Sequence, residues 1–153
     1  MATSSTAFAT GGCQCGQVRY ALSTMPKISV CFCRMCQKAV GNYFGAFATV
    51  PREDLIWTRG GPATFASSEA AERGFCSDCG TPLTFRYLGK DRVSVTAGSL
   101  DDPARAAPER AHGIEGRVPF IAEIAHLPGA RTDDEIPPAD LPRYTSRQHP
   151  DRD

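Results

Sequence analysis

Gly74-Phe75-Cys76-Ser77-Asp78-Cys79-Gly80 places two cysteines three positions apart and a glycine directly after them. A gap of two residues lets both sulfurs converge on one metal ion, and the glycine relaxes the backbone of the turn. An earlier stretch, Gly11-Gly12-Cys13-Gln14-Cys15-Gly16, has the same character. Zinc prefers four tetrahedral ligands, so the two turns are predicted to face one ion. The predicted ligands of this closed structural zinc site are Cys13, Cys15, Cys76 and Cys79.

The remaining cysteines of the chain form a triplet, Cys31, Cys33 and Cys36. They are close enough in sequence to bind one zinc by themselves, and three protein ligands leave a fourth position for water or substrate. We therefore predict a catalytic zinc at the triplet and two zinc ions per chain, the second of them labile. Two other interpretations stay open: a second purely structural ion, or reactive thiols without metal. Spacing also permits a swapped arrangement, in which Cys31 and Cys36 join Cys76 and Cys79.

Composition and charge narrow the classes of function. The chain has 153 residues, with 17 basic and 17 acidic side chains and no formal net charge. Such a balance argues against electrostatic binding to nucleic acid or to an anionic membrane. No apolar run approaches the roughly 20 residues that cross a bilayer, and the N-terminus lacks the pattern of a secretory signal. We expect a cytoplasmic protein with reduced thiols, of an oligomeric state that the sequence does not specify.

Short apolar alternations separated by Gly and Pro predict a mainly β domain of two small sheets, with short helical turns and zinc as a staple. The expected helical turn covers residues 34–40. The expected strands cover residues 18–22, 28–30, 43–50, 55–57, 63–67, 83–87, 93–97 and 118–127. Residues 11–127 form the predicted domain, between a loose leader (1–10) and an irregular, proline-rich tail (128–153).

Four motifs together resemble the glutathione-dependent formaldehyde-activating enzyme family, which also includes centromere protein V. They are Gly11-Gly12-Cys13-Gln14-Cys15-Gly16-Gln17-Val18-Arg19-Tyr20, Cys31-Phe32-Cys33-Arg34-Met35-Cys36-Gln37-Lys38, Arg73-Gly74-Phe75-Cys76-Ser77-Asp78-Cys79-Gly80-Thr81 and Ala97-Gly98-Ser99-Leu100-Asp101-Asp102-Pro103. The resemblance implies a β-tent fold, four cysteines on a structural zinc and three on a catalytic one. It also implies a carbon–sulfur lyase reaction that joins or splits glutathione and formaldehyde through S-(hydroxymethyl)glutathione. One position departs from the family pattern, because Phe32 stands where the family commonly has His.

The mechanistic hypothesis is that a small thiol such as glutathione takes the open position at the triplet, where zinc favours the thiolate. Its sulfur then adds to, or leaves from, an aldehyde carbon, so the expected partners are a small thiol and an aldehyde. The alternative is a non-catalytic zinc module with a structural or protein-interaction role. Arg34 and Lys38 either attract substrate carboxylates or form a solvated basic edge. His112 is expected to be a structural or a cavity residue, and Arg73 to have a structural partner.

Overall fold

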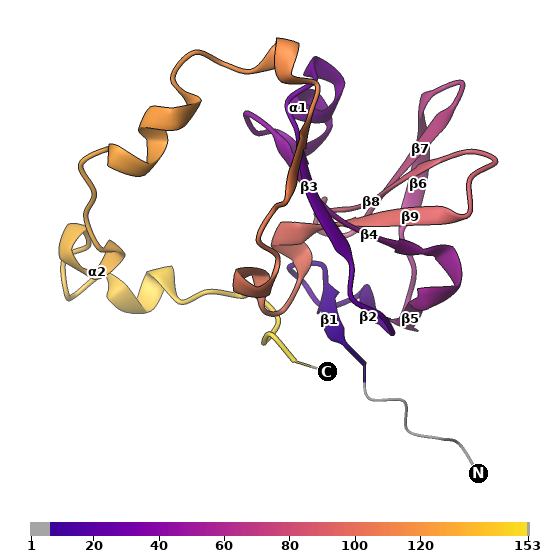
Figure 1. Cartoon of the computed structure of the whole chain (residues 1–153). Coiled ribbons are helices and arrows are strands. Elements are labelled where there is room, and N and C mark those ends of the chain that lie inside the picture. The colour runs from indigo at the N-terminus through magenta and orange to yellow at the C-terminus, as the bar shows by residue number, and fades with distance from the viewer. Residues whose placement is uncertain (1–6, 153) are drawn as a thin grey trace.

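The computed structural model describes residues 7–152 and shows a mainly β architecture (Figure 1). One sheet has three strands in the order β1-β2-β5, and the other has seven in the order β10-β3-β4-β9-β8-β7-β6. The strands are β1 (Ala9–Gly12), β2 (Arg19–Leu22), β3 (Lys27–Cys31), β4 (Gly45–Pro51), β5 (Leu55–Arg59), β6 (Ala63–Ser68), β7 (Ala71–Phe75), β8 (Pro82–Tyr87), β9 (Arg92–Thr96) and β10 (Arg110–His112). The helices are α1 (Arg34–Val40), α2 (Thr132–Glu135) and 3-10 turns. The prediction of a two-sheet β fold with short helices is confirmed.

The hydrophobic core lies between the two sheets and draws side chains from both. Tyr20 and Leu22 come from the small sheet and are fully buried. Val50, Leu83 and Val95 from the large sheet belong to the same cluster. Ala46, Ala48 and Val50 share one face of β4 and pack in or against the core, because successive side chains of a strand point to opposite faces. The other face is left to carry a functional site.

Strand pairing places the cysteine triplet at one end of the large sheet. β3 runs antiparallel to β4, with Cys31 opposite Gly45. β10 runs parallel to β3, with His112 opposite Cys31. Directly after β3, Cys33 caps the N-terminus of α1 by accepting a 3.5 Å hydrogen bond from the backbone N–H of Cys36. A strand end and a helix start therefore bring the three cysteines into one turn.

Several segments differ from the sequence-based expectation, among them β1, which includes the last residues of the expected leader. Residues 118–127 were predicted to form a strand, but the structure has a 3-10 helix at Ile121–His126. Pro119 lacks a backbone N–H for a sheet ladder and fixes its own φ, which explains the loss of strand structure. β7 and β10 were not predicted, because their charged and small residues show no apolar alternation.

The chain after β10 leaves the sheets and comes back to them. Figure 1 shows an arc, coloured orange to yellow, that returns toward the three-stranded sheet near the C-terminus. Within the predicted leader, residues 1–6 lie outside the described residues, whereas Ala9 and Thr10 belong to β1. The division into leader, domain and tail stays a prediction. None of the helices in residues 7–152 combines the length and apolar character that crossing a bilayer requires.

Candidate metal centres and the adjoining cavity

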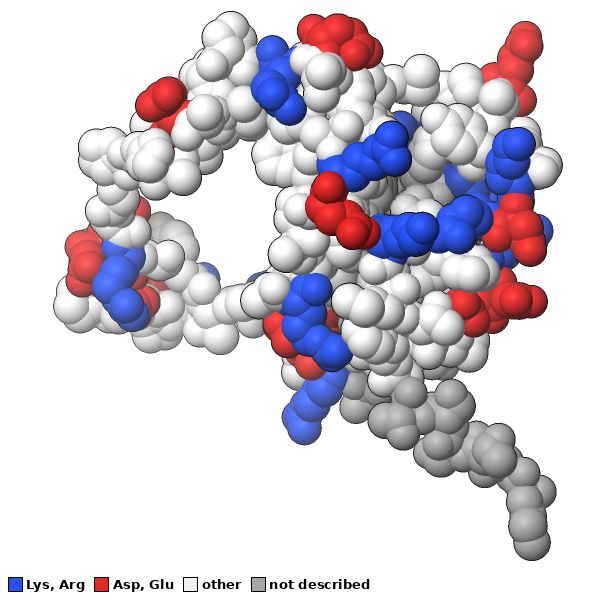
Figure 2. Space-filling model, viewed as in Figure 1, with Lys and Arg blue, Asp and Glu red and all other residues white. Residues whose placement is uncertain are grey.

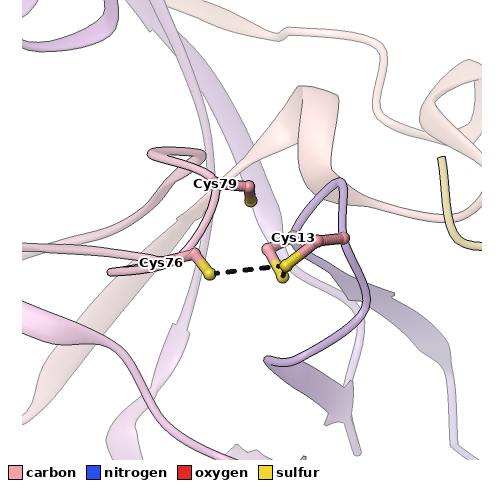
Figure 3. Close-up of side chains that lie close together, drawn as sticks. Cys13, Cys76 and Cys79 are labelled. Carbon is pink, nitrogen blue, oxygen red and sulfur yellow. Dashed lines mark hydrogen bonds between the residues drawn. The ribbon is translucent and has the colours of Figure 1, made fainter. Parts of the chain in front are cut away.

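The two Cys-Gly turns bring four sulfurs together. Figure 3 shows the two turns facing each other, with Cys13 on one and Cys76 and Cys79 on the other. The Sγ atoms of Cys13, Cys15, Cys76 and Cys79, the four-cysteine cluster, all lie within 4.8 Å of one another. The sulfur of Cys15 is 3.5 Å from that of Cys13 and 3.8 Å from that of Cys76. Four sulfurs at the usual zinc distance of about 2.3 Å form a tetrahedron with edges of about 3.8 Å. The donor set and its spacing therefore fit a zinc ion.

Hydrogen bonds from backbone N–H groups close both turns. In the first turn, the N–H of Cys13 donates to the C=O of Val18 over 2.9 Å, and the N–H of Val18 donates to the Cys13 sulfur over 3.3 Å. In the second, the N–H of Cys76 donates to the C=O of Thr81 over 3.0 Å, and Gly80 N–H donates to Cys76 C=O over 2.9 Å. Each turn is thus closed by its own hydrogen bonds, which hold its sulfurs in position.

Thr81 links the two turns and acts on the charge of the cluster. Its hydroxyl accepts from the backbone N–H of Gln14 over 3.1 Å and lies 3.1 Å from the Cys79 sulfur. Burial opposes ionisation of Cys79, but hydrogen bonds with Thr81 and Cys15 outweigh it and lower the Cys79 pKa to about 6. The N–H of Gln17 favours the Cys15 thiolate, yet desolvation and the neighbouring thiols raise the Cys15 pKa to about 12. Sulfurs packed this closely cannot all ionise unless a cation lies between them. The cluster therefore holds either protons or a metal ion.

The second group comprises Cys31, Cys33 and Cys36, the three-cysteine cluster, whose sulfurs also lie within 4.8 Å of one another. Burial and the neighbouring thiols raise the pKa of Cys31 to about 12. Burial also works against the Cys33 thiolate, but the N–H of Cys36 and the adjacent thiols hold the Cys33 pKa below its ordinary value. Three converging sulfurs fit a zinc ion that keeps one position for another ligand. The structure has this grouping and not the swapped one.

The three-cysteine cluster opens onto a cavity of about 580 Å³, here called the basic cavity. Aromatic and thioether side chains form its apolar wall, namely Met35, Phe47, Phe85 and Tyr87. Cationic side chains also line the cavity, namely Arg73, Arg86, Lys90 and Arg92, together with the single carboxylate in its described lining, that of Asp91. In Figure 2, Lys and Arg side chains gather on the side of the molecule where Figure 1 places β6 to β9. A cavity of this size and composition accommodates a small anionic molecule.

His112 joins the three-cysteine cluster in the lining of the basic cavity. Its C=O accepts the N–H of Phe32 over 2.9 Å, so β10 is fastened to the turn that carries the cysteines. Gly113 follows with φ +57°, and a Cβ there would lie 2.7 Å from the Cys33 nitrogen. Only glycine permits this close approach. Sequence analysis left the role of His112 open, and its place opposite Cys31 across the β3–β10 pair assigns it to the cavity.

Phe32 lies in the packing beneath the cysteine turn. It is buried, its ring centroid is 5.6 Å from that of Phe44, and the Arg117 guanidinium lies 4.8 Å from its ring. The described residues that line the basic cavity include neither Phe32 nor the flanking Arg34 and Lys38. Arg34 instead donates to the Gln37 side chain over 3.2 Å. The cations of the cavity come from β7, β8, β9 and the β8–β9 turn, which the sequence did not link to the triplet.

Arg73 is the residue of the cavity lining whose surroundings sequence reasoning anticipated least. It is only 5% exposed, and its Nη2 donates to the Cys36 sulfur over 3.3 Å. No signal in the sequence around Arg73 distinguishes it from a surface arginine. Its partner is a sulfur of the other cluster, 37 positions away.

Comparisons with known proteins agree with this geometry. A family model described as glutathione-dependent formaldehyde-activating enzyme matches residues 8–114, which include both cysteine clusters. An "uncharacterized lyase" of Schizosaccharomyces pombe is 34% identical over 89 residues, 57% of this chain and 64% of that protein, so the match spans less than two thirds of the relative. A crystal structure of a Rhodobacter sphaeroides protein superimposes with a TM-score of 0.54 at 20% identity, over 67% of this chain and 98% of the other, which shows a shared fold. The chain therefore belongs to the glutathione-dependent formaldehyde-activating enzyme family.

Proposed function

We propose that the protein is a zinc-dependent carbon–sulfur lyase that acts on the adduct of a small thiol and an aldehyde, such as S-(hydroxymethyl)glutathione. The observation that carries the proposal is the three-cysteine cluster opening onto a cavity with cationic lining. Family membership and a relative named a lyase support it. The activity requires reduced thiols, which the cytoplasm maintains.

Both sulfur clusters fit zinc, with different consequences. The four-cysteine cluster would hold a structural ion, since four protein ligands close the coordination shell. The three-cysteine cluster would hold the catalytic ion. Zinc bound there supplies a Lewis acid that lowers the pKa of a thiol or water in its remaining position. The chain's own residues would bind the substrate and handle its proton.

Substrate binding would rely on the lining of the basic cavity. Lys90 and Arg92 are exposed at its edge, and a glutathione molecule carries two carboxylates that can approach them. The rings of Phe85 and Tyr87, with centroids 4.9 Å apart, form an apolar wall against which the peptide would lie. Binding between charged rim and apolar wall would orient the thiol toward the sulfur cluster and exclude water from it.

The proposed reaction moves one proton. When the thiol sulfur bonds to the aldehyde carbon, the π electrons of the carbonyl move to its oxygen, the sulfur loses its proton and the oxygen gains one. Cleavage of the adduct reverses each change. The His112 imidazole lines the same cavity as the cysteines and would carry this proton to and from the substrate oxygen.

Replacing Cys33 by Ser tests the proposal. Serine is a good helix N-cap, so Cys33→Ser keeps the cap of α1 while it removes one thiolate ligand. We expect wild-type protein to hold two zinc ions and to accelerate adduct formation and cleavage, measured by exchange NMR with labelled formaldehyde and glutathione. We expect Cys33→Ser to retain one ion and to lose turnover by at least about 100-fold.

Ser29→Ala is the matched control, because Ser29 lines the same cavity without contributing a sulfur. It should keep both ions and turn over far faster than Cys33→Ser, because it removes only a hydroxyl from the cavity wall. A Cys33→Ser protein that lost one zinc yet kept full activity would refute the lyase mechanism. Wild-type protein with two ions and no acceleration would instead favour a non-catalytic zinc module.

A further inference from the structure

Arg73 is a buried cation whose contacts contain no carboxylate. Its Nη2 donates to Cys36 Sγ over 3.3 Å, its Nε donates to Ser67 Oγ over 2.9 Å, and its guanidinium carbon lies 4.7 Å from the centroid of the Phe85 ring. Within residues 7–152, no ion pair joins Arg73 to an acidic side chain. Arg86, on the same cavity wall, pairs with Glu72 over 2.9 Å. The two arginines therefore differ in how their charges are balanced.

Burying a guanidinium without a counter-charge is costly. Cys36, its sulfur partner, is itself 6% exposed, so water neutralises neither group effectively. Three thiolates around a divalent zinc carry a net charge of minus one. This charge balances the charge of plus one on the Arg73 guanidinium. The buried arginine and the occupied three-cysteine cluster therefore compensate each other, whereas either alone leaves a charge in a poorly solvated place.

The local structure holds the guanidinium against the sulfur from several sides. The β7–β8 pair places Arg73 opposite Phe85, whose ring packs on the guanidinium. Ser67 on β6 accepts the Nε proton and donates its own to the Met35 sulfur on α1 over 3.3 Å. Three strands and the helix of the triplet thus constrain one side chain. Such constraint is typical of groups that orient a metal ligand from outside the coordination shell.

We propose that Arg73 is a positioning residue that supplies the counter-charge of the three-cysteine metal centre and raises its affinity for zinc. This inference rests on the proposed function, because it requires a metal at that cluster. The sulfur contacts of the four-cysteine cluster include a backbone N–H and a hydroxyl, from Val18 and Thr81. Loss of the Arg73 charge should consequently affect one of the two sites selectively.

Competition with a chromophoric zinc chelator measures the affinity of each site in the full-length protein. We expect Arg73→Met to weaken zinc binding at the three-cysteine cluster about 10- to 100-fold and to leave the four-cysteine cluster unchanged. Arg73→Lys keeps the charge and should restore most of the affinity. Arg86→Met is the matched control, since it removes a cation from the same wall without removing a sulfur contact, and it should bind zinc as wild type does.

The outcomes separate this inference from the proposed function. Wild-type protein that binds one ion would overturn both. If wild-type protein binds two ions and Arg73→Met has unchanged zinc affinities, only the role of Arg73 is overturned. The same holds if Arg73→Met raises the KM for the thiol substrate without changing either zinc affinity. Thermal melting checks the fold. If Arg73→Met does not fold, Ser67→Ala is measured instead, and it should weaken zinc several-fold at the same site; unchanged affinity there would overturn the inference.

Discussion

At the scale of single residues, one ion pair stabilises the junction between the small sheet and the loop after β9. The Arg19 guanidinium donates to both carboxylate oxygens of Asp101, over 2.8 and 2.6 Å. The two side chains are 3% and 11% exposed. Thr10 on β1 donates to the same carboxylate. The structure thus gives Asp101 a bidentate partner 82 positions away.

Asp101→Asn is predicted to lower the free energy of unfolding by about 3 kcal/mol, because it removes the carboxylate charge that pairs with the buried Arg19 guanidinium. Urea denaturation at pH 7 measures this change. Asp102→Asn is the control at an exposed neighbour and should stay within about 0.5 kcal/mol of wild type. Equal stability of the two variants would show that the ion pair contributes nothing in solution.

The same pair predicts a pH dependence. Burial alone would raise the pKa of Asp101, but hydrogen bonds from Arg19 and Thr10 hold it below the ordinary value of 3.8. A carboxyl with a lowered pKa adds stability above its unfolded pKa and loses it as the pH falls through its folded pKa. The difference in stability between wild type and Asp101→Asn should therefore be full at pH 6 and shrink below about pH 4.

At the scale of elements, the two Cys-Gly turns share a backbone conformation and differ in their surroundings. Gly16 has φ +80° and Gly80 has φ +77°. A Cβ on Gly16 would lie 2.2 Å from the His149 ring, whereas a Cβ on Gly80 would meet nothing within 4 Å. The backbone N–H of His149 also donates to the C=O of Gln14 over 2.8 Å. The returning tail thus rests on the first turn.

Alanine substitutions in the two turns are predicted to separate backbone strain from tail docking. Gly80→Ala should cost about 1 kcal/mol, the strain of a left-handed conformation. Gly16→Ala should cost clearly more, because its methyl group also displaces His149. In a His149→Gly background the cost of Gly16→Ala should fall to that of Gly80→Ala, as a double-mutant cycle by chemical denaturation would show. Identical costs in the wild-type background would mean that the tail does not rest on this turn in solution.

Both cysteine clusters could be anticipated from the sequence, because sulfurs separated by one or two residues in a turn can bind one ion, although spacing alone left the swapped arrangement open. The strands around Tyr20, Val50 and Val95 were also predictable, since burial on one face imposes a period of two. Arg73 was not, because a buried arginine has the same sequence signature as a surface one. The apolar run 118–127 misled the prediction, since Pro119, which has no backbone N–H to donate to a ladder, outweighs the apolar character of the segment. No local sequence pattern predicts the backbone hydrogen bond between His149 and Gln14.

At the scale of the whole molecule, the four-cysteine cluster connects the two sheets. Cys15 and Cys76 lie 61 positions apart, in the β1–β2 turn and the β7–β8 turn respectively. Closing so long a loop through an ion restricts the unfolded chain strongly. The three-cysteine cluster instead lies within one turn and opens onto the basic cavity. In the proposed function, an ion at the first cluster would stabilise the fold, and an ion at the second would be open to substrate.

Zinc-edge X-ray absorption of the fully loaded protein, before and after addition of glutathione, tests this division most directly. Four sulfurs at one ion and three at the other predict an average of about 3.5 sulfur ligands per zinc, and a thiol in the remaining position raises the average to about 4. The Cys33→Ser protein should hold a single zinc with about four sulfur ligands and show no response. A wild-type average that is already four without glutathione, or that does not change when the thiol is added, would contradict an open, thiol-binding centre.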